Sequence, residues 1–144
     1  PQTFVNIIGE SVLYIASFLR INVKDIVCVL EDTSLDVGEL RVDYVLSKIQ
    51  HAGIESMSRA LKSDRFAKVR VGVGRPKEKG KMEEYLLQDF TDDENLILID
   101  VLNKAEAAVR MLLTHNIEEV QNKYNPEGAI KLEKRKVRKI RIRR

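Results

Sequence analysis

The spacing of apolar and polar positions predicts both helices and strands. A helix with one buried stripe is predicted over 10–20, because apolar residues recur there at the i, i+3, i+4, i+7 spacing of a single helix face. These positions are Val12, Ile15, Ala16 and Leu19. The run IVCVL at 26–30 is short, β-branched and uninterrupted, which is typical of a strand covered on both faces. Cys28, inside this run, is therefore expected in the core.

Two further strands and two further helices are predicted. In chain order they cover 40–46, 52–62, 68–73 and 92–113. The last helix opens with a capping box, in which Thr91 caps the N-terminus and Glu94 reaches back to it. Strands that alternate with helices in this way indicate an α/β domain with a parallel or mixed central sheet.

Length and composition fit one domain with a substantial core. The chain has 144 residues, of which 44% are hydrophobic and 33% charged. A single cysteine excludes an internal disulfide framework, and the sequence has no Cys/His cluster of the zinc-module type. The adjacent acids Glu31 and Asp32 are typical of a solvated loop after a strand, so no metal site and no cofactor are expected. No apolar run approaches the roughly 18 residues that span a bilayer, so no membrane partner is expected either.

The net charge of +3 conceals a strong asymmetry. Residues 131–144 hold nine of the 25 basic and one of the 22 acidic residues, hence +8, which leaves 16 basic and 21 acidic residues and a charge of −5 elsewhere. Like charges in one run repel each other and are relieved by phosphate, so RNA is the expected partner of this segment. The alternatives are a sorting signal and a docking site for an acidic protein.

The chain is accordingly divided into a domain at 1–113, a connector at 114–130 and a basic RNA-binding tail at 131–144. The residues expected to contact RNA are Lys131, Lys134, Arg135, Lys136, Arg138, Lys139, Arg141, Arg143 and Arg144.

Five segments, in order, resemble motifs of bacterial-type peptidyl-tRNA hydrolase. The family pattern KPxTFMNxSG corresponds to PQTFVNIIG at 1–9, and VxHDDLDLPLGKLR corresponds to the stretch 27–41. GGHNGLKSI aligns with IQHAGIESM at 49–57, and FxRLRIGIGRP with FAKVRVGVGRP at 66–76. YVLxxFxxxE follows as YLLQDFTDDE at 85–94. The resemblance implies a three-layer α/β fold with a mixed central sheet, whose first strand is not among these residues.

The resemblance also implies an activity, hydrolysis of the ester that joins peptide to tRNA. It places the histidine general base upstream of residue 1 and an aspartate that orients this base at the position of Glu31. The polar cleft residues that keep their family identity are Asn6, His51 and Arg75, whereas the family asparagine after the histidine is Ala52, which cannot donate a hydrogen bond from its side chain. His51 by itself is typical of a loop or capping histidine.

These departures favour a catalytically inactive homologue that serves as a structural or assembly component of a ribonucleoprotein. An organellar ribosome in the mitochondrial matrix is the expected setting, with rRNA and ribosomal proteins as partners; plastid and cytosol are alternatives. An active peptidyl-tRNA hydrolase with further sequence upstream, and tRNA as its partner, is the second hypothesis. The third is an organellar RNA-splicing cofactor, which would need an exposed apolar surface formed by Ile49, Ile54 and Met57.

Overall fold

Three strands form one mixed sheet between two layers of helices. The computed structural model describes residues 2–45, 51–76, 78 and 80–125. The strands are β1 (Val27–Asp32), β2 (Leu40–Asp43) and β3 (Ala67–Gly72), in the order β1-β3-β2. β1 runs parallel to β3 with Val29 opposite Val69, and β2 runs antiparallel to β3 with Val42 opposite the same residue.

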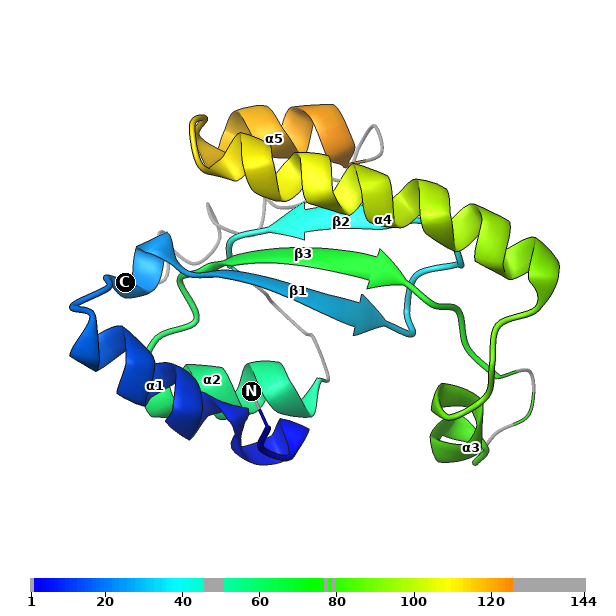
Figure 1. Ribbon diagram of the computed structural model, residues 1–144, viewed down its shortest axis with the longest axis horizontal. Coiled ribbons are helices and arrows are strands. Elements are labelled where there is room, and N and C mark those ends of the chain that lie inside the picture. Colours follow the sequence, from blue (N-terminus) through cyan, green and yellow to red (C-terminus); the bar gives the residue numbers. More distant parts are fainter. Residues whose placement is uncertain (1, 46–50, 77, 79, 126–144) are drawn as a thin grey trace, which may run out of the picture.

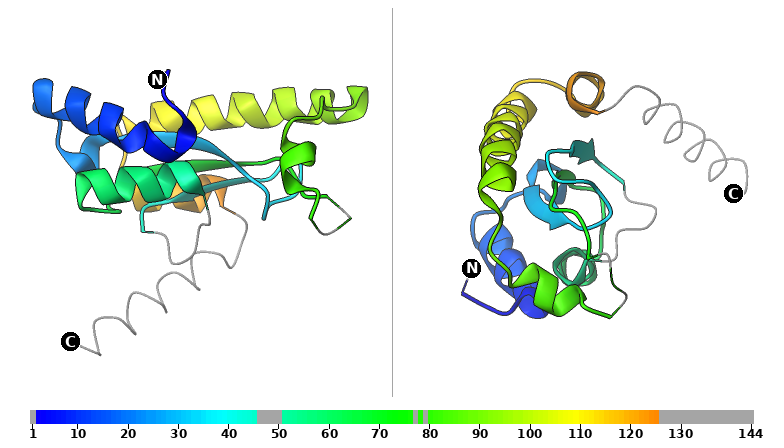
Figure 2. Two further views of the ribbon diagram at one scale, coloured as in Figure 1. Left: turned by 90° about the horizontal axis from the view of Figure 1, so that it is seen from below. Right: turned by 90° about the vertical axis from the view of Figure 1, so that its right-hand side faces the viewer.

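The helices flank the sheet on both faces (Figures 1 and 2). Helices α1 (Ile8–Phe18) and α2 (Ala52–Leu61) lie on one side, and α4 (Asp92–Leu112) and α5 (Ile117–Tyr124) lie on the other. The short helix α3 (Met82–Leu86) stands beyond the carboxyl ends of β1 and β3, and two 3-10 turns occur at Val5–Ile7 (η1) and Val23–Asp25 (η2). The α/β class, the mixed sheet and the three layers are thus confirmed.

Each face of the sheet has its own core. Toward α4 and α5, Val42, Val69 and Val101 are fully buried in one cluster. Toward α1 and α2, Leu30 and Phe66 pack with buried residues of α2 in a second cluster, which Cys28 joins as a partly buried side chain. Successive residues of a strand point to opposite faces, and Leu30 pairs with Arg70, the residue after Val69, which explains why Leu30 and Val69 belong to different clusters.

Helix α1 packs through only part of the predicted stripe: Ala16 is buried and Val12 is partly buried against the second cluster. Gly9 and Ala16 are buried, and a Cβ on Gly9 would lie 2.2 Å from the carbonyl oxygen of Ser56. Ile15 and Leu19, predicted to be buried, are 53% and 58% exposed. The prediction was therefore right for Val12 and Ala16 and wrong for Ile15 and Leu19, because nothing in the described part of the chain covers that side of the helix.

Strand β1 also differs from its prediction. The strand forms where expected, but it occupies an edge of the described sheet, and Val29 at its centre is 52% exposed. The sequence predicted that both faces of this strand are covered, but in the structure one face is partly open.

The expected connector at 114–130 contains a packed helix. Asn116 caps the N-terminus of α5, whose Val120 is fully buried against β2 and α4. After α5, Asn125 is also buried and bonds to the main chain of Val42. The folded domain consequently continues at least to Asn125, beyond the expected boundary at 113, because α5 supplies part of the core over β2.

The remaining predicted elements agree with the structure within a few residues. The capping box of α4 is present, with Thr91 Oγ1 accepting from the Glu94 amide and Glu94 accepting from the Thr91 amide. Helix α2 and strand β3 match their predicted ranges closely. The strand expected over 40–46 ends at Asp43, and 46 lies outside the described residues. Ile54 and Met57, expected on an exposed partner surface, are buried in the core instead, since they form the inner face of α2; Ile49 is not described.

Candidate functional site

His51 is the N-cap of α2, as its sequence context predicted. Its backbone is extended, and its Nδ1 accepts hydrogen bonds from the amides of Gly53 at 3.1 Å and Ile54 at 3.4 Å. Both amides belong to the first turn of the helix, where backbone N–H groups have no partner within the helix. Since Nδ1 acts as an acceptor, the imidazole carries its proton on Nε2.

The Nε2 of His51 donates to Oε1 of Glu31 over 3.0 Å. Glu31 lies near the carboxyl end of β1, and α2 begins beneath that end of the sheet, so strand and helix together bring the groups into contact. The hydrogen bond to Glu31 raises the pKa of His51, and the same bond lowers the pKa of Glu31. The side chain of Glu31 is 52% exposed and that of His51 only 16%, so the carboxylate is the accessible member of the pair.

Two of the other predicted site residues lie beside this pair. Asn6 is exposed in η1, and η1 packs against the start of α2: a Cβ on Gly53 would lie 3.1 Å from Cγ2 of Val5. Ala52, the first residue of α2, is exposed. The structure thus brings Asn6, Glu31, His51 and Ala52 to one end of the sheet.

Arg75 does not join the pair. It is exposed three residues after β3 ends, and among the described residues no hydrogen bond or ion pair links it to Glu31 or His51.

A second polar cluster, centred on Arg70, was not predicted. Arg70 Nε and Nη2 contact Oδ2 of Asp32 at 2.7 and 2.6 Å, and Nη1 contacts Oδ2 of Asp43 at 2.8 Å. Ser34 donates its amide to Asp32 Oδ1 at 2.7 Å. Burial alone would raise the pKa of Asp32, but the bonds from Ser34 and Arg70 outweigh it and lower that pKa. The cluster ties all three strands together directly beside Glu31.

The sequence of β3 does contain a pattern that points to buried charges. Lys68 and Arg70 are alternate residues of one strand and therefore share a sheet face, where charges need partners. The fully buried Lys68 donates from Nζ to the carbonyl oxygens of Tyr44, at 2.9 Å, and Asp64, and lies 3.9 Å from the Phe66 ring centroid. Burial lowers the pKa of Lys68 to about 8.

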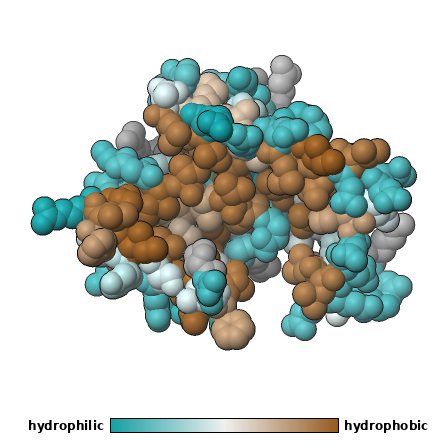
Figure 3. Space-filling model, viewed as in Figure 1, coloured by the Kyte–Doolittle hydropathy of each residue, from teal (hydrophilic) through white to brown (hydrophobic). Residues whose placement is uncertain are grey.

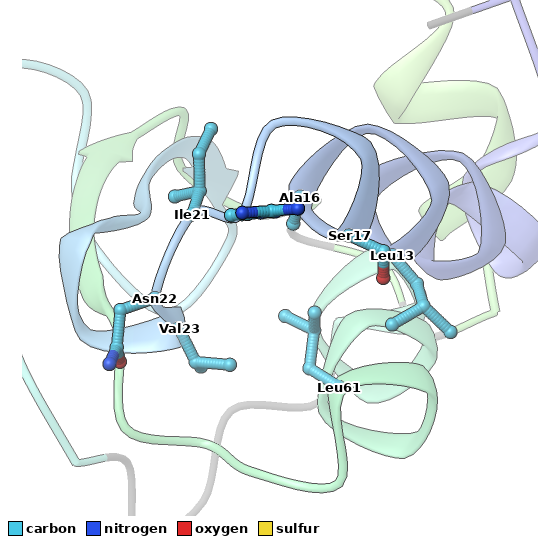
Figure 4. A pocket seen from close by; sticks show the side chains of 8 residues that line it. Leu13, Ala16, Ser17, Ile21, Asn22, Val23 and Leu61 are labelled. Carbon is cyan, nitrogen blue, oxygen red and sulfur yellow. The ribbon is translucent and has the colours of Figure 1, made fainter.

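A shallow groove occurs at the opposite end of α2 from His51 (Figure 4). It has a volume of about 360 Å³ and is lined by Leu13, Ala16, Ile21 and Leu61, among others, with Arg20 as its charged residue. Its lining residues include no carboxylate or imidazole, so this groove is not a candidate site for acid–base chemistry.

Neither a metal site nor a membrane span is found in the part of the chain that the structure describes. No group of three or more His, Cys, Asp or Glu side chains within 2–45, 51–76 and 80–125 has the arrangement needed to hold a metal ion. No described helix is both long and apolar enough to cross a bilayer. The nine basic residues predicted to bind RNA, Lys131 to Arg144, lie outside the described residues.

Comparison with known proteins identifies the family. The family model for peptidyl-tRNA hydrolase matches residues 1–135. Over 125 residues, or 87% of this chain, the sequence is 37% identical to a peptidyl-tRNA hydrolase of Clostridium acetobutylicum and 38% identical to one of Clostridium botulinum. The match covers 66% and 65% of these two proteins, so the chain spans just under two thirds of their length.

The fold comparison agrees. A crystal structure of peptidyl-tRNA hydrolase from Acinetobacter baumannii superposes with a TM-score of 0.79 over 87% of this chain and 63% of that chain, at 21% sequence identity. At this identity the likeness is one of fold alone. The sequence matches carry the assignment, and by them the chain belongs to the peptidyl-tRNA hydrolase family.

Proposed function

We propose that the whole protein hydrolyses the ester that joins peptide to tRNA, and that this chain contributes the Glu31–His51 pair to its active site. The observation that carries the proposal is the 3.0 Å hydrogen bond between these side chains at the carboxyl end of β1, with the Asn6 segment packed beside it. The identity to proteins named peptidyl-tRNA hydrolase supports the choice of substrate.

The hydrogen bonds of His51 decide which role it has. Its Nδ1 is occupied by two amides of α2 and its Nε2–H by Glu31, so no lone pair is available to take a proton from water while the helix cap is formed. His51 is therefore a positioning residue, which fixes the orientation of the Glu31 carboxylate.

Glu31 is the member of the pair that can act on a further group. Its side chain is half exposed and its lowered pKa keeps it ionised at neutral pH. In this proposal Glu31 orients the imidazole of a second histidine, as the family resemblance implies for this position. That histidine removes a proton from water, the resulting hydroxide adds to the ester carbonyl carbon, and the 3′ oxygen of the tRNA leaves with a proton. The glutamate is one methylene longer than the family aspartate, and the His51 contact restrains that extra length.

Release of peptide from a model peptidyl-tRNA by the whole gene product tests the proposal. Glu31→Gln should lower kcat/KM by about 10²- to 10⁴-fold, and Glu31→Asp should retain more of the activity than Glu31→Gln does. Glu55→Gln, an exposed acid in the first turn of α2, is the matched control and should be close to wild type. A whole protein without activity, or a fully active Glu31→Gln variant, would refute the proposal.

A second candidate, a non-hydrolysing ribonucleoprotein component in an organelle, is favoured by two features. Ala52 offers no side-chain donor where the family has asparagine, and residues 131–144 carry a charge of +8. If this segment binds single-stranded RNA through about five phosphates, log affinity should fall against log salt with a slope of about −3.5. Deletion of 131–144 should flatten that slope and release the protein from its particle. An unchanged slope after deletion would count against this candidate without affecting the first.

A further inference from the structure

The hydroxyl of Ser56 caps a helix other than its own. Ser56 is buried near the middle of α2, and its Oγ accepts a hydrogen bond of 3.0 Å from the amide of Gly9. Gly9 is the second residue of α1, where backbone N–H groups have no partner within the helix. The N-cap of α1 is Ile7, whose side chain accepts no hydrogen bond. Ser56 therefore supplies from α2 the acceptor that a serine or asparagine N-cap would normally supply.

A serine in this position is explained by the bond to Gly9. Serine is not a strong helix former, and a buried hydroxyl costs free energy unless it is hydrogen-bonded. The other buried residues of α2 are Gly53, Ile54 and Met57, which have no hydroxyl or amide in their side chains. The hydroxyl of Ser56 thus serves a contact with a segment 47 positions earlier in the sequence.

The segment that leads into α1 is fixed on α2 at two points about one helical turn apart. At the first point Val5 packs on the start of α2, where a Cβ on Gly53 would lie 3.1 Å from Cγ2 of Val5. The second point is the bond from Gly9 to Ser56. Residues three apart lie on one face of a helix, so both points are on the same side of α2. Asn6 lies between them in the sequence, so its main chain is held relative to α2.

Asn6 presents its carboxamide beside the Glu31–His51 pair. Its neighbours in η1, Val5 and Ile7, are apolar and 50% and 41% exposed, and Figure 3 shows that the surface from α1 across the β1 region is largely apolar. Asn6 is itself exposed, and its side chain forms no hydrogen bond with the described residues. A carboxamide has both donors and an acceptor, so Asn6 is the residue of η1 whose side chain can hydrogen-bond a substrate.

We propose that Ser56 is a positioning residue for the hydrolysis: through Gly9 it holds the carboxamide of Asn6 where that group hydrogen-bonds the peptidyl ester beside Glu31. The inference rests on the proposed function. Ser56 is buried and does not itself touch the substrate. Without its hydroxyl the Gly9 amide loses its acceptor, and packing alone holds η1 in place. A displacement of about 1 Å in a substrate-binding group can cost up to about 10²-fold in rate, so the loss should appear in kcat/KM.

A double-mutant cycle on the whole gene product tests the proposal, with a model peptidyl-tRNA as substrate. Ser56→Ala should lower kcat/KM by about tenfold when Asn6 is present and by less than about twofold in the Asn6→Ala background. The Tm should fall by the same amount in both backgrounds, because the bond to Gly9 does not involve the Asn6 side chain. Ser58→Ala removes a hydroxyl two residues further along α2 and is the matched control, with kcat/KM expected within about twofold of wild type.

A purely structural role for Ser56 would lower kcat/KM by the same factor in both backgrounds, and that result would overturn the proposal. So would an Asn6→Ala variant with the kcat/KM of wild type. If Ser56→Ala does not fold, Ser56→Cys takes its place in the cycle and should show the same coupling, because it keeps the shape of the side chain but is a weaker acceptor.

Failure of this inference can be told from failure of the proposed function. Equal factors in a protein that Glu31→Gln inactivates refute the role of Ser56 alone. A wild-type protein without activity, or a fully active Glu31→Gln variant, refutes the proposed function, and the role of Ser56 falls with it.

Discussion

Glu31 and His51, which are 20 positions apart in the sequence, are joined by a hydrogen bond of 3.0 Å that lowers the pKa of Glu31 and raises the pKa of His51. The pKa of Glu31 lies below its usual 4.5, so the stabilisation it provides is present above that pH and is lost as the pH falls through the folded value. The pKa of His51 lies above its usual 6.5, so its contribution is present below 6.5 and is lost as the pH rises through the folded value. The pair should therefore contribute most between about pH 4.5 and 6.5.

This pH window can be measured on the Glu31→Gln variant. We expect the difference in unfolding free energy between wild type and variant to be largest near pH 5.5 and to shrink by about pH 9. Denaturant unfolding at a series of pH values measures it, with Glu55→Gln as a charge-matched control. Parallel stability curves for wild type and Glu31→Gln would contradict the expectation.

The cap and the ion pair of His51 can be separated by substitution. His51→Asn keeps a strong N-cap for the amides of Gly53 and Ile54 but loses the contact to Glu31, whereas His51→Ala loses both. His51→Ala should be less stable than His51→Asn by about 1 kcal/mol. Urea unfolding at about pH 9, where the ion pair contributes little, isolates the cap. Equal stabilities would show that water replaces the imidazole at no cost.

Gly9 should tolerate no side chain. A Cβ there would lie 2.2 Å from the Ser56 carbonyl oxygen and 2.9 Å from the Met57 nitrogen, both backbone atoms that cannot turn aside. Gly9→Ala should force α1 away from α2 and cost about 3 kcal/mol or more. Gly80→Ala is the control: its Cβ meets nothing within 4 Å, and only its positive φ of 87° opposes the substitution, at about 1 kcal/mol. In thermal unfolding, Gly9→Ala should lower the Tm more than Gly80→Ala does. A larger loss for Gly80→Ala would contradict the close approach of α1 to α2 at Gly9.

Arg70 should be far more important for stability than Arg75. Arg70→Met would leave Asp32 and Asp43, 7% and 8% exposed, without their shared cation, at a cost of about 3–5 kcal/mol near pH 7. The cost should fall at acid pH, because protonated carboxyls no longer need the cation. Arg75→Met removes an exposed side chain and should change stability by less than about 0.5 kcal/mol. A similar loss in both variants would show that the cluster contributes little.

Local signals in the sequence predicted local structure well. The capping box of Thr91 and Glu94 spans three residues, and its chemistry is complete within the first turn of α4. The same kind of signal, Asn116 followed by Glu119, also marks the start of α5 and could have placed that helix. His51 was interpreted as a loop or capping histidine, and it is a cap whose partners are two and three residues away.

Contacts between distant segments were not predictable from pattern alone. The Glu31–His51 bond depends on where α2 begins under the sheet, and the Arg70 cluster depends on the register of three strands. Ile15 and Leu19 were mispredicted as buried because an apolar pattern shows which side chains avoid water but not which element packs against them. Helix α1 comes so close to α2 at Gly9 that only a residue without a side chain fits there. The pattern of hydrophobic positions contains no sign of this close approach.

Asn125 covers the outer edge of β2 at Val42, where Gln121 also donates to the Val42 carbonyl at 3.1 Å. The Oδ1 of Asn125 accepts from the amide of Val42 at 2.7 Å and its Nδ2 donates to the carbonyl of the same residue at 2.9 Å, so the carboxamide imitates the peptide group of a neighbouring strand. Fibre growth by edge pairing requires two available edges on every molecule, one to join the fibre and one to receive the next molecule. With Val42 bonded in this way, the middle of β2 offers no free main-chain groups to a strand of another molecule, so this edge cannot serve as one of the two.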